Sequence, residues 1–201
     1  MFGGPSIDQL IPVVLYTDAY VVRGEIKTRQ RRVTDILNHA EDTFVVLSDA
    51  TYEEYGTRAQ AIRSEFAQVN LGAVLFAVAD TAVDPTPELR TVKIPEQAMI
   101  TIPPFKVIGR IHLLPERDLR EALSELTGRF VPVTEATFWS DVVAEPRTPV
   151  AMVAVNHARA QILAPHREVD PWAGLDRSAA VGGSAARRLD ADVGGSGGQP
   201  A

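Results

Sequence analysis

Two stretches of this 201-residue chain resemble each other at a nearly constant spacing. Residues 105–111 repeat the aromatic residue, the Val, the Gly and the Ile of residues 20–26 at an offset of 85 positions. After one inserted residue the offset becomes 86, and residues 134–138 match residues 48–52 with only conservative substitutions. Because an offset that stays constant over separated blocks rarely arises by chance, the sequence predicts a tandem duplication. The duplication restricts the fold to two copies of one small unit.

The composition between and after the two copies indicates where the domains end. Residues 81–87 contain two prolines among polar residues, as is typical of an extended connector. The C-terminal part is rich in Gly and Ser and poor in the apolar side chains that a folded segment has to bury. We therefore expect an N-terminal extension over residues 1–11, repeat unit 1 over residues 12–80, a connector over residues 81–96, repeat unit 2 over residues 97–165 and a disordered tail over residues 166–201.

Each copy begins with the pattern of a β-hairpin. Residues 13–17 and 20–28 are rich in β-branched and aromatic side chains on either side of a short polar break, and residues 99–113 repeat the pattern around a proline pair. Gly24 and Gly109 fall in the middle of the second strand of each hairpin. Glycine at such a position indicates a bulge, a sharp bend or a close backbone approach, and a bend helps a small barrel to close.

The remainder of each copy predicts a short helix and two more strands. Apolar residues at i, i+3 and i+4 indicate an amphipathic helix over residues 33–37 and again over residues 119–123. Buried strands are predicted at residues 44–47 and 130–133, loops or irregular strands at residues 52–64 and 139–148, and one closing apolar strand at residues 69–78 and 152–163.

The fold class predicted from these elements is mainly β with short helices. A unit of about 65 residues buries only about 60% of the surface that its unfolded chain exposes, and is therefore marginally stable alone. We expect two repeated small β-barrel-like units that pack against each other with pseudo-twofold symmetry.

Copy one resembles the Sm-like small β-barrel in the order of its features. The first feature is a strand with a Gly and an apolar residue two positions later, Gly24 and Ile26. The second is a polar turn with Asp35 that ends in Leu37-Asn38, and the third is Asn70 near the start of the closing strand. The sequence departs from that family because the Arg-Gly pair beside the last Asn is absent. Copy two also departs from it, with Glu121, Leu123 and Ser124 at the turn. The resemblance implies a small barrel that binds nucleic acid.

Both copies also resemble an uncharacterised bacterial small β-rich domain. The shared pattern is Tyr-x-x-x-Gly-x-Ile, then Asp-x-Leu-Asn, then Asp-Ala-Thr, which copy one carries from Tyr20 to Thr51. This second resemblance covers both copies and implies no particular activity.

Composition and motifs exclude several classes of function. The chain has no Cys, so it has no disulfide, thiolate metal site or cysteine nucleophile, which fits a cytoplasmic protein. A net charge of −6 disfavours nonspecific binding to nucleic acid or to anionic lipid. The N-terminus lacks the features of a secretory signal, and no apolar run is long enough to span a bilayer. We find no catalytic motif and expect no enzyme activity, cofactor or metal.

A few side chains are candidates for binding. Arg29, Arg31 and Arg32 form a basic cluster that could contact phosphate or an acidic partner, or could simply be solvated. Asn70 and Asn156 are matching residues of the two copies that could bind a ligand or tie down a loop.

Other candidates are less specific. Trp172 could hold the root of the tail on the protein or anchor a partner. The matching carboxylates Asp35 and Glu121 could do acid–base chemistry if the fold brought them together, or could lie on a solvated helix face. The four histidines lack the spacing of a metal site.

The function that these patterns favour is a non-enzymatic binding or scaffold protein. The duplication keeps packing and turn residues, not reactive ones, so we expect protein–protein interaction or self-assembly, and a homo-oligomer. Two alternatives stay open: an Sm-like nucleic-acid-binding protein that uses Arg29, Arg31 and Arg32, and a small-ligand-binding protein with a pocket between the repeats.

Overall fold

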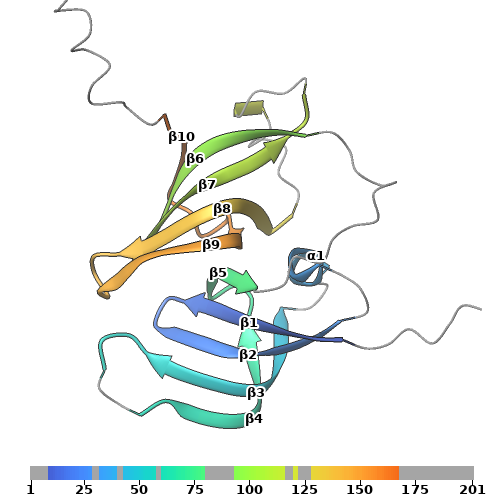
Figure 1. The fold of residues 1–201 in the computed structure, drawn as a ribbon. Coiled ribbons are helices and arrows are strands. Elements are labelled where there is room, and N and C mark those ends of the chain that lie inside the picture. The colour runs from blue at the N-terminus through green and yellow to red at the C-terminus, as the bar shows by residue number, and fades with distance from the viewer. Residues whose placement is uncertain are drawn as a thin grey trace, which may run out of the picture. The chain divides into compact units, whose positions relative to one another are not determined.

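The computed structural model describes residues 9–28, 32–39, 43–57, 60–79, 93–115, 120–121 and 128–167. These residues form a mainly β structure, with ten strands in a single antiparallel sheet and a short helix beside it (Figure 1). The elements are β1 (Gln9–Thr17), β2 (Tyr20–Thr28), α1 (Val33–Asn38), β3 (Phe44–Glu54), β4 (Ile62–Asn70), β5 (Val74–Ala79), β6 (Ile94–Ile102), β7 (Phe105–Leu113), β8 (Phe130–Ser140), β9 (Glu145–Asn156) and β10 (Ile162–Pro165).

The strands follow the order β10-β6-β7-β8-β9-β5-β1-β2-β3-β4 across the sheet. Among the described strands, β4 and β10 each have one neighbour, and Figure 1 shows them at opposite ends of the sheet. The prediction of barrel-like units is therefore wrong, because the sheet is not closed into a barrel. The edge of β5 that would have to return to β4 pairs with β9 instead, in the register Phe76↔Val155, Ala77↔Ala154 and Val78↔Val153.

The first five strands and the last five strands each follow the same order. The first run is β5-β1-β2-β3-β4, and the second is β10-β6-β7-β8-β9. The pairing that joins the two runs is β5 with β9, which occupy different places in their runs. A twofold axis would pair the same strand of both runs, so the expected pseudo-twofold packing is not shown.

The two predicted hairpins are confirmed, and so are the bulges at their glycines. Strand β1 pairs with β2 and β6 pairs with β7, while the register of the next pairing shifts beside Gly24 and beside Gly109. A Cβ on Gly109 would lie 2.6 Å from Val133 Cγ1 and 2.9 Å from the carbonyl oxygen of Thr134. Only glycine lets the backbones approach this closely.

The opposite strands carry the other half of each bulge. Asp49 on β3 and Glu135 on β8 have φ of 46° and 47°, in the left-handed region that few side chains tolerate. Both residues lie inside strands and not in turns.

The closing part of each copy contains two strands where one was predicted. Strand β4 ends at Asn70, whose Oδ1 accepts a hydrogen bond from Gly72 N at 2.8 Å and so closes a tight turn into β5. The ends of strands also extend into the two segments predicted as loops or irregular strands, at residues 52–54 and 62–64 of the first and at residues 139–140 and 145–148 of the second. The polar composition of these segments hid the strands, because one face of β4 is largely exposed.

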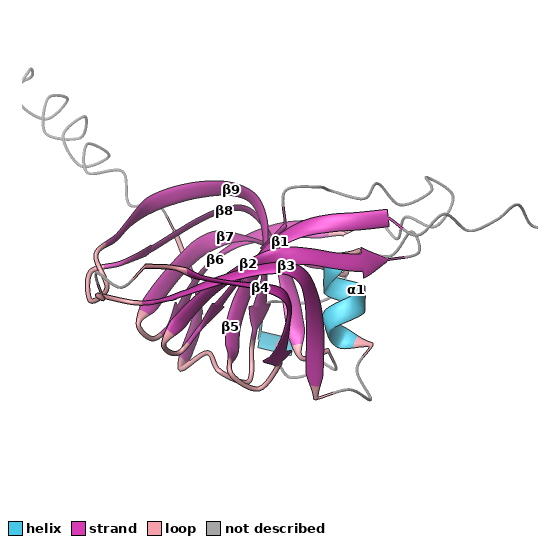
Figure 2. Cartoon of the chain, turned by 90° about the horizontal axis from the view of Figure 1, so that it is seen from below, coloured by secondary structure: helices cyan, strands magenta, loops and turns pink. Residues whose placement is uncertain are grey.

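The core consists of two clusters, one centred on each run. In the cluster around the second run, Tyr16 stacks on Phe76 with ring centroids 4.5 Å apart, and both rings pack against Phe105 and Phe138. The cluster around the first run includes Leu37 of α1, and the predicted helix there is confirmed. Figure 2 shows α1 beside the strands of the sheet.

Several predictions fall wholly or partly outside the described residues. The second predicted helix is described only at residues 120–121, which are helical. Of the predicted connector, residues 81–92 lie outside, and β6 begins at Ile94 within it. The described part of the predicted tail ends at Arg167.

Candidate interaction surface

Three large apolar side chains are exposed together on the outer strands β3 and β4. Phe44, Val46 and Phe66 are 44%, 55% and 64% exposed, and we call them the edge patch. In the β3–β4 register, Val46 lies opposite Gln68 and Ser48 lies opposite Phe66, so the three residues share one face of the sheet. The other face carries Val45 and Leu47, which are buried in the core.

The alternation of strand residues explains why the edge patch is not evident from the sequence. All four residues at positions 44–47 are apolar, a pattern that predicts burial on both faces. The structure buries only every second residue, because no described element covers the other face of β3. The prediction that Phe44 and Val46 are buried is therefore wrong.

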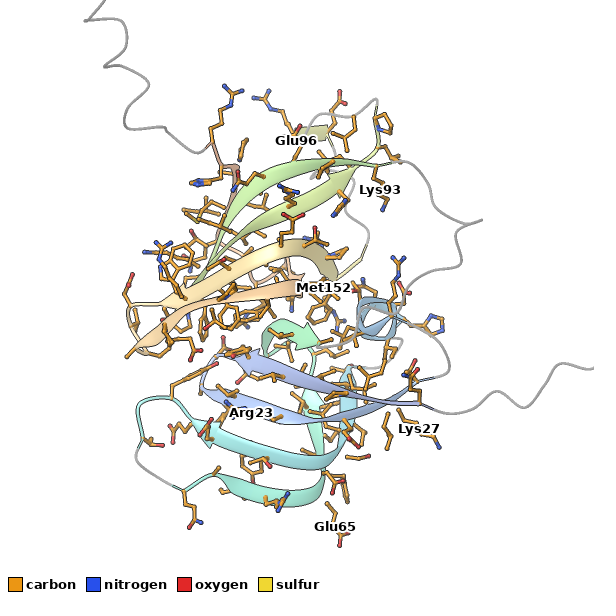
Figure 3. All side chains as sticks on the ribbon, viewed as in Figure 1. Arg23, Lys27, Glu65, Lys93, Glu96 and Met152 are labelled. Carbon is orange, nitrogen blue, oxygen red and sulfur yellow. The ribbon has the colours of Figure 1, made fainter. Side chains whose placement is uncertain are left out.

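Of the residues 86 positions after the edge patch, Phe130 is buried and Met152 is half-buried, whereas Pro132, the counterpart of Val46, is exposed. Phe130 on β8 is 1% exposed and packs in the same cluster as Leu37, Val74 and Ala77. Met152 on β9 is half-buried, and Figure 3 shows it over the middle of the sheet, whereas Glu65 lies at the β4 end. Phe130 is thus covered by α1 and β5 in the second run, whereas no described element covers Phe44 in the first.

The two asparagines singled out from the sequence lie at the ends of β4 and β9. Asn156 is 1% exposed, and its Nδ2 donates to the carbonyl oxygens of Val74 at 2.9 Å and Leu71 at 3.3 Å. It therefore ties β9 to the turn that precedes β5. Asn70 is exposed, and its Oδ1 closes the turn at Gly72. Of the two roles that the sequence leaves open, these bonds support the one in which the asparagines hold loops.

A second set of contacts reinforces the β5–β9 junction. Arg159 follows β9, forms an ion pair with Asp18 in the β1–β2 turn, and donates from Nη1 to the carbonyl oxygen of Gly72 at 3.3 Å. Because the two charged side chains are partly exposed, the ion pair adds specificity of placement more than stability.

The basic cluster is described only in part. Arg32 lies directly before α1 and is exposed, without a side-chain hydrogen bond that caps the helix. Arg29 and Arg31 lie outside the described residues, and so does Trp172.

The candidate acid–base and metal-ligating residues are exposed or have structural partners. Asp35 and Glu121 are exposed. Glu135 forms an ion pair with Arg110 at 2.6 Å, and the Nε2 atom of His112 lies 2.7 Å from Thr134 Oγ1. Within the described residues, no group of three His, Asp or Glu side chains could hold a metal ion.

Two tyrosines near the aromatic core have perturbed acidities. Burial raises the pKa of the Tyr16 phenol to about 12, with a smaller contribution from the negative charge of Glu145. Burial also raises the pKa of Tyr55, whose hydroxyl donates to the carbonyl oxygen of Thr17 at 3.3 Å. Phenols held in the neutral form are suited to packing and not to proton transfer at neutral pH.

None of the helices in the described residues has the length and apolar character needed to cross a membrane. Protein-family models, curated proteins and solved structures were all compared with the chain, and none of them matches it.

Proposed function

We propose that this protein is a non-enzymatic scaffold that self-associates through the edge patch and the neighbouring strand β4. The observation that carries the proposal is the contrast between Phe44, which is 44% exposed, and Phe130, which is 1% exposed at the matching position of the other run. The second run shows how such a phenylalanine is buried when another strand and a helix cover it.

The surface has the properties of a protein contact. Exposed apolar side chains that gather on one face are typical of interaction sites, whereas scattered ones are ordinary. An edge strand also presents unpaired backbone N–H and C=O groups that another strand can bond. Strand β4 combines both properties, because it carries Phe66 and has one neighbour among the described strands.

We further propose that the chain arose by tandem duplication of one unit. The common strand order of the two runs supports this origin, as do the matching bulges at Gly24 and Gly109 and the matching left-handed residues Asp49 and Glu135. A duplicated unit would carry the same unpaired strand edge twice, and among the described strands β9 has a second neighbour at this edge whereas β4 has none. The Sm-like relationship is part of this proposal and adds no separate activity to it.

Size-exclusion chromatography with light scattering tests the self-association. We expect the wild type to have a mass that is a multiple of 21.8 kDa, and Phe66→Lys to have a smaller mass because a charge replaces an exposed apolar side chain. Val142→Lys is the matched control, since Val142 is 80% exposed in the turn between β8 and β9. A wild type that stays monomeric over a wide range of concentrations would contradict the proposal.

A further inference from the structure

We infer that the chain assembles head to tail, with β4 of one copy paired to β10 of the next copy. This inference rests on the proposed self-association and names its partner and its register. The β4 edge of one copy is thus bound by a second copy of this chain, and the second copy uses its β10 for the contact.

The chain itself contains the template for this contact. Inside the sheet, β9 is the last strand of the second run and pairs with β5, the first strand of the other run. Strand β4 has the place in its run that β9 has, and β10 has the place that β5 has. The two edges that have no neighbour among the described strands are therefore of the same two kinds as the edges joined in the β5–β9 pairing.

The backbone bonds at each free edge leave the right groups pointing outward. Leu71 N donates to the carbonyl oxygen of Thr43 at 2.8 Å, so alternation along β4 directs the N–H and C=O of Gln68 away from β3. His166 N donates to the carbonyl oxygen of Gln97 at 2.9 Å. The same alternation along β10 therefore directs the N–H and C=O of Leu163 away from β6. Gln68 and Leu163 are thus placed to exchange two hydrogen bonds.

The internal junction also gives the register. The β5–β9 pairs are Phe76↔Val155, Ala77↔Ala154 and Val78↔Val153. Adding 86 to each β5 number and subtracting 86 from each β9 number gives the expected pairs of β10 with β4, which are Ile162↔Val69, Leu163↔Gln68 and Ala164↔Ala67. The central pair joins two residues whose backbone groups face outward, so this register is compatible with the alternation along both strands. Pro165 follows the last pair, and a proline without an N–H ends the ladder there.

Asn70 has a defined part in this contact. Asn156 donates to the carbonyl oxygens of Leu71 and Val74 across the internal junction. Moved by 86 positions, the same bonds run from Asn70 Nδ2 to the carbonyl oxygens of His157 and Ala160 in the next copy. Asn70 uses its Oδ1 for the bond to Gly72, so the amide group that would donate across this contact is its Nδ2.

A contact between β4 of one copy and β10 of the next is heterologous. An open assembly therefore has an unpaired β4 at one end and an unpaired β10 at the other. Such contacts continue until the assembly closes on itself or grows as a filament. A symmetric contact between two β4 strands would instead use one edge twice. The two arrangements differ in which residues come close together.

Engineered cysteines distinguish the two arrangements, because the native chain has no Cys. Ala67→Cys and Ala164→Cys form the non-hydrogen-bonded pair next to the central one, where side chains lie closest and a disulfide can form. We expect an oxidised mixture of the two single variants to give a covalent dimer of one 67-variant and one 164-variant, identified by mass spectrometry. Each variant alone should remain uncrosslinked. A mixture of Ala67→Cys with Ile162→Cys, two residues out of register, should crosslink less.

The outcomes separate this inference from the proposed function. If the wild type associates but Ala67→Cys alone crosslinks, or the mixture does not, the head-to-tail register is wrong and self-association stands. If the wild type is monomeric, the proposed function itself fails. As an independent readout, we expect Asn70→Ala to weaken association about tenfold through the loss of two hydrogen bonds. An unchanged association constant would contradict the assignment of Asn70.

Discussion

Asn38 binds both backbone polar groups of Phe130, a residue 92 positions further along the chain. Its Oδ1 accepts from Phe130 N at 2.6 Å, and its Nδ2 donates to the carbonyl oxygen of Phe130 at 2.7 Å. A side-chain amide thus takes the place of a neighbouring strand at the start of β8. The bond joins α1 of the first run to the second run, on the side where β7 has already ended.

Replacing Asn38 with Ala should destabilise the protein, because it leaves both polar groups of Phe130 without these bonds. We expect the free energy of unfolding to fall by about 2–3 kcal/mol, measured by urea denaturation at a fixed protein concentration. Thr57→Ala is the control, since it removes one exposed hydrogen bond from the β3–β4 connection. Equal losses for the two variants would mean that Asn38 is not needed to hold β8.

The two matching asparagines should differ in their effect on stability. Asn156→Ala removes two buried hydrogen bonds at the β5–β9 junction and should lower the free energy of unfolding by about 2–3 kcal/mol. Within one molecule, at protein concentrations too low for association, Asn70→Ala removes a single exposed turn bond and should cost about 1 kcal/mol or less. Parallel urea titrations of the two variants check the difference. The same loss at both positions would contradict the assigned role of the junction.

Gly109→Ala should be more harmful than an equivalent change at a glycine with free space around it. The added Cβ would lie 2.6 Å from Val133 Cγ1, so the bulge has to open, at a cost of about 2–3 kcal/mol. Gly56 is the matched control, because no atom lies within 4 Å of the point that its Cβ would occupy. Its φ is 69°, so Gly56→Ala should still cost about 1 kcal/mol. Thermal unfolding of both variants tests this order, and a reversed order would rule out the steric explanation.

Stability should fall at alkaline pH because of the buried phenols. The folded state raises the pKa of Tyr16 from 10.0 to about 12 and also raises that of Tyr55, so the folded protein holds both protons more tightly than the unfolded chain. These groups leave the free energy of unfolding unchanged below pH 10 and lower it as the pH rises from 10 to about 12. Urea midpoints measured over this range should show the loss.

Tyr16→Phe tests the origin of this pH dependence. The variant lacks one of the two protons, so its stability should fall less steeply between pH 10 and about 12. Tyr20→Phe is the control, since the Tyr20 side chain is 42% exposed, and it should follow the wild type. An unchanged slope in Tyr16→Phe would show that Tyr16 is not the group responsible.

The sequence was sufficient to predict the hairpins, α1 and the glycine bulges, because each of these is determined by residues close together in the chain. The β-branched pattern on either side of Asp18 and Ala19 specifies a hairpin, and a mid-strand Gly needs a close backbone approach. These features do not depend on which strand comes to lie beside them.

The open sheet and the edge patch could not be predicted in the same way. A local pattern does not reveal that β5 pairs with β9 and not with β4, because both choices bury the same apolar strand. The run at positions 44–47 is equally apolar on both faces, and only the absence of a cover over Phe44 and Val46 in the described structure makes them a surface. Asn38 belongs to a sequence motif, but its bond to Phe130 depends on the packing of the two runs.

The β5–β9 pairing also affects how the chain is made. Strand β5 is buried along nearly its whole length, yet Val153 leaves the ribosome 75 residues after its partner Val78. At about 5–20 residues per second, one edge of this apolar strand stays open for about 4–15 seconds during synthesis. A nascent chain halted before β9 would keep that edge open permanently, and we expect it to depend on chaperones or to aggregate.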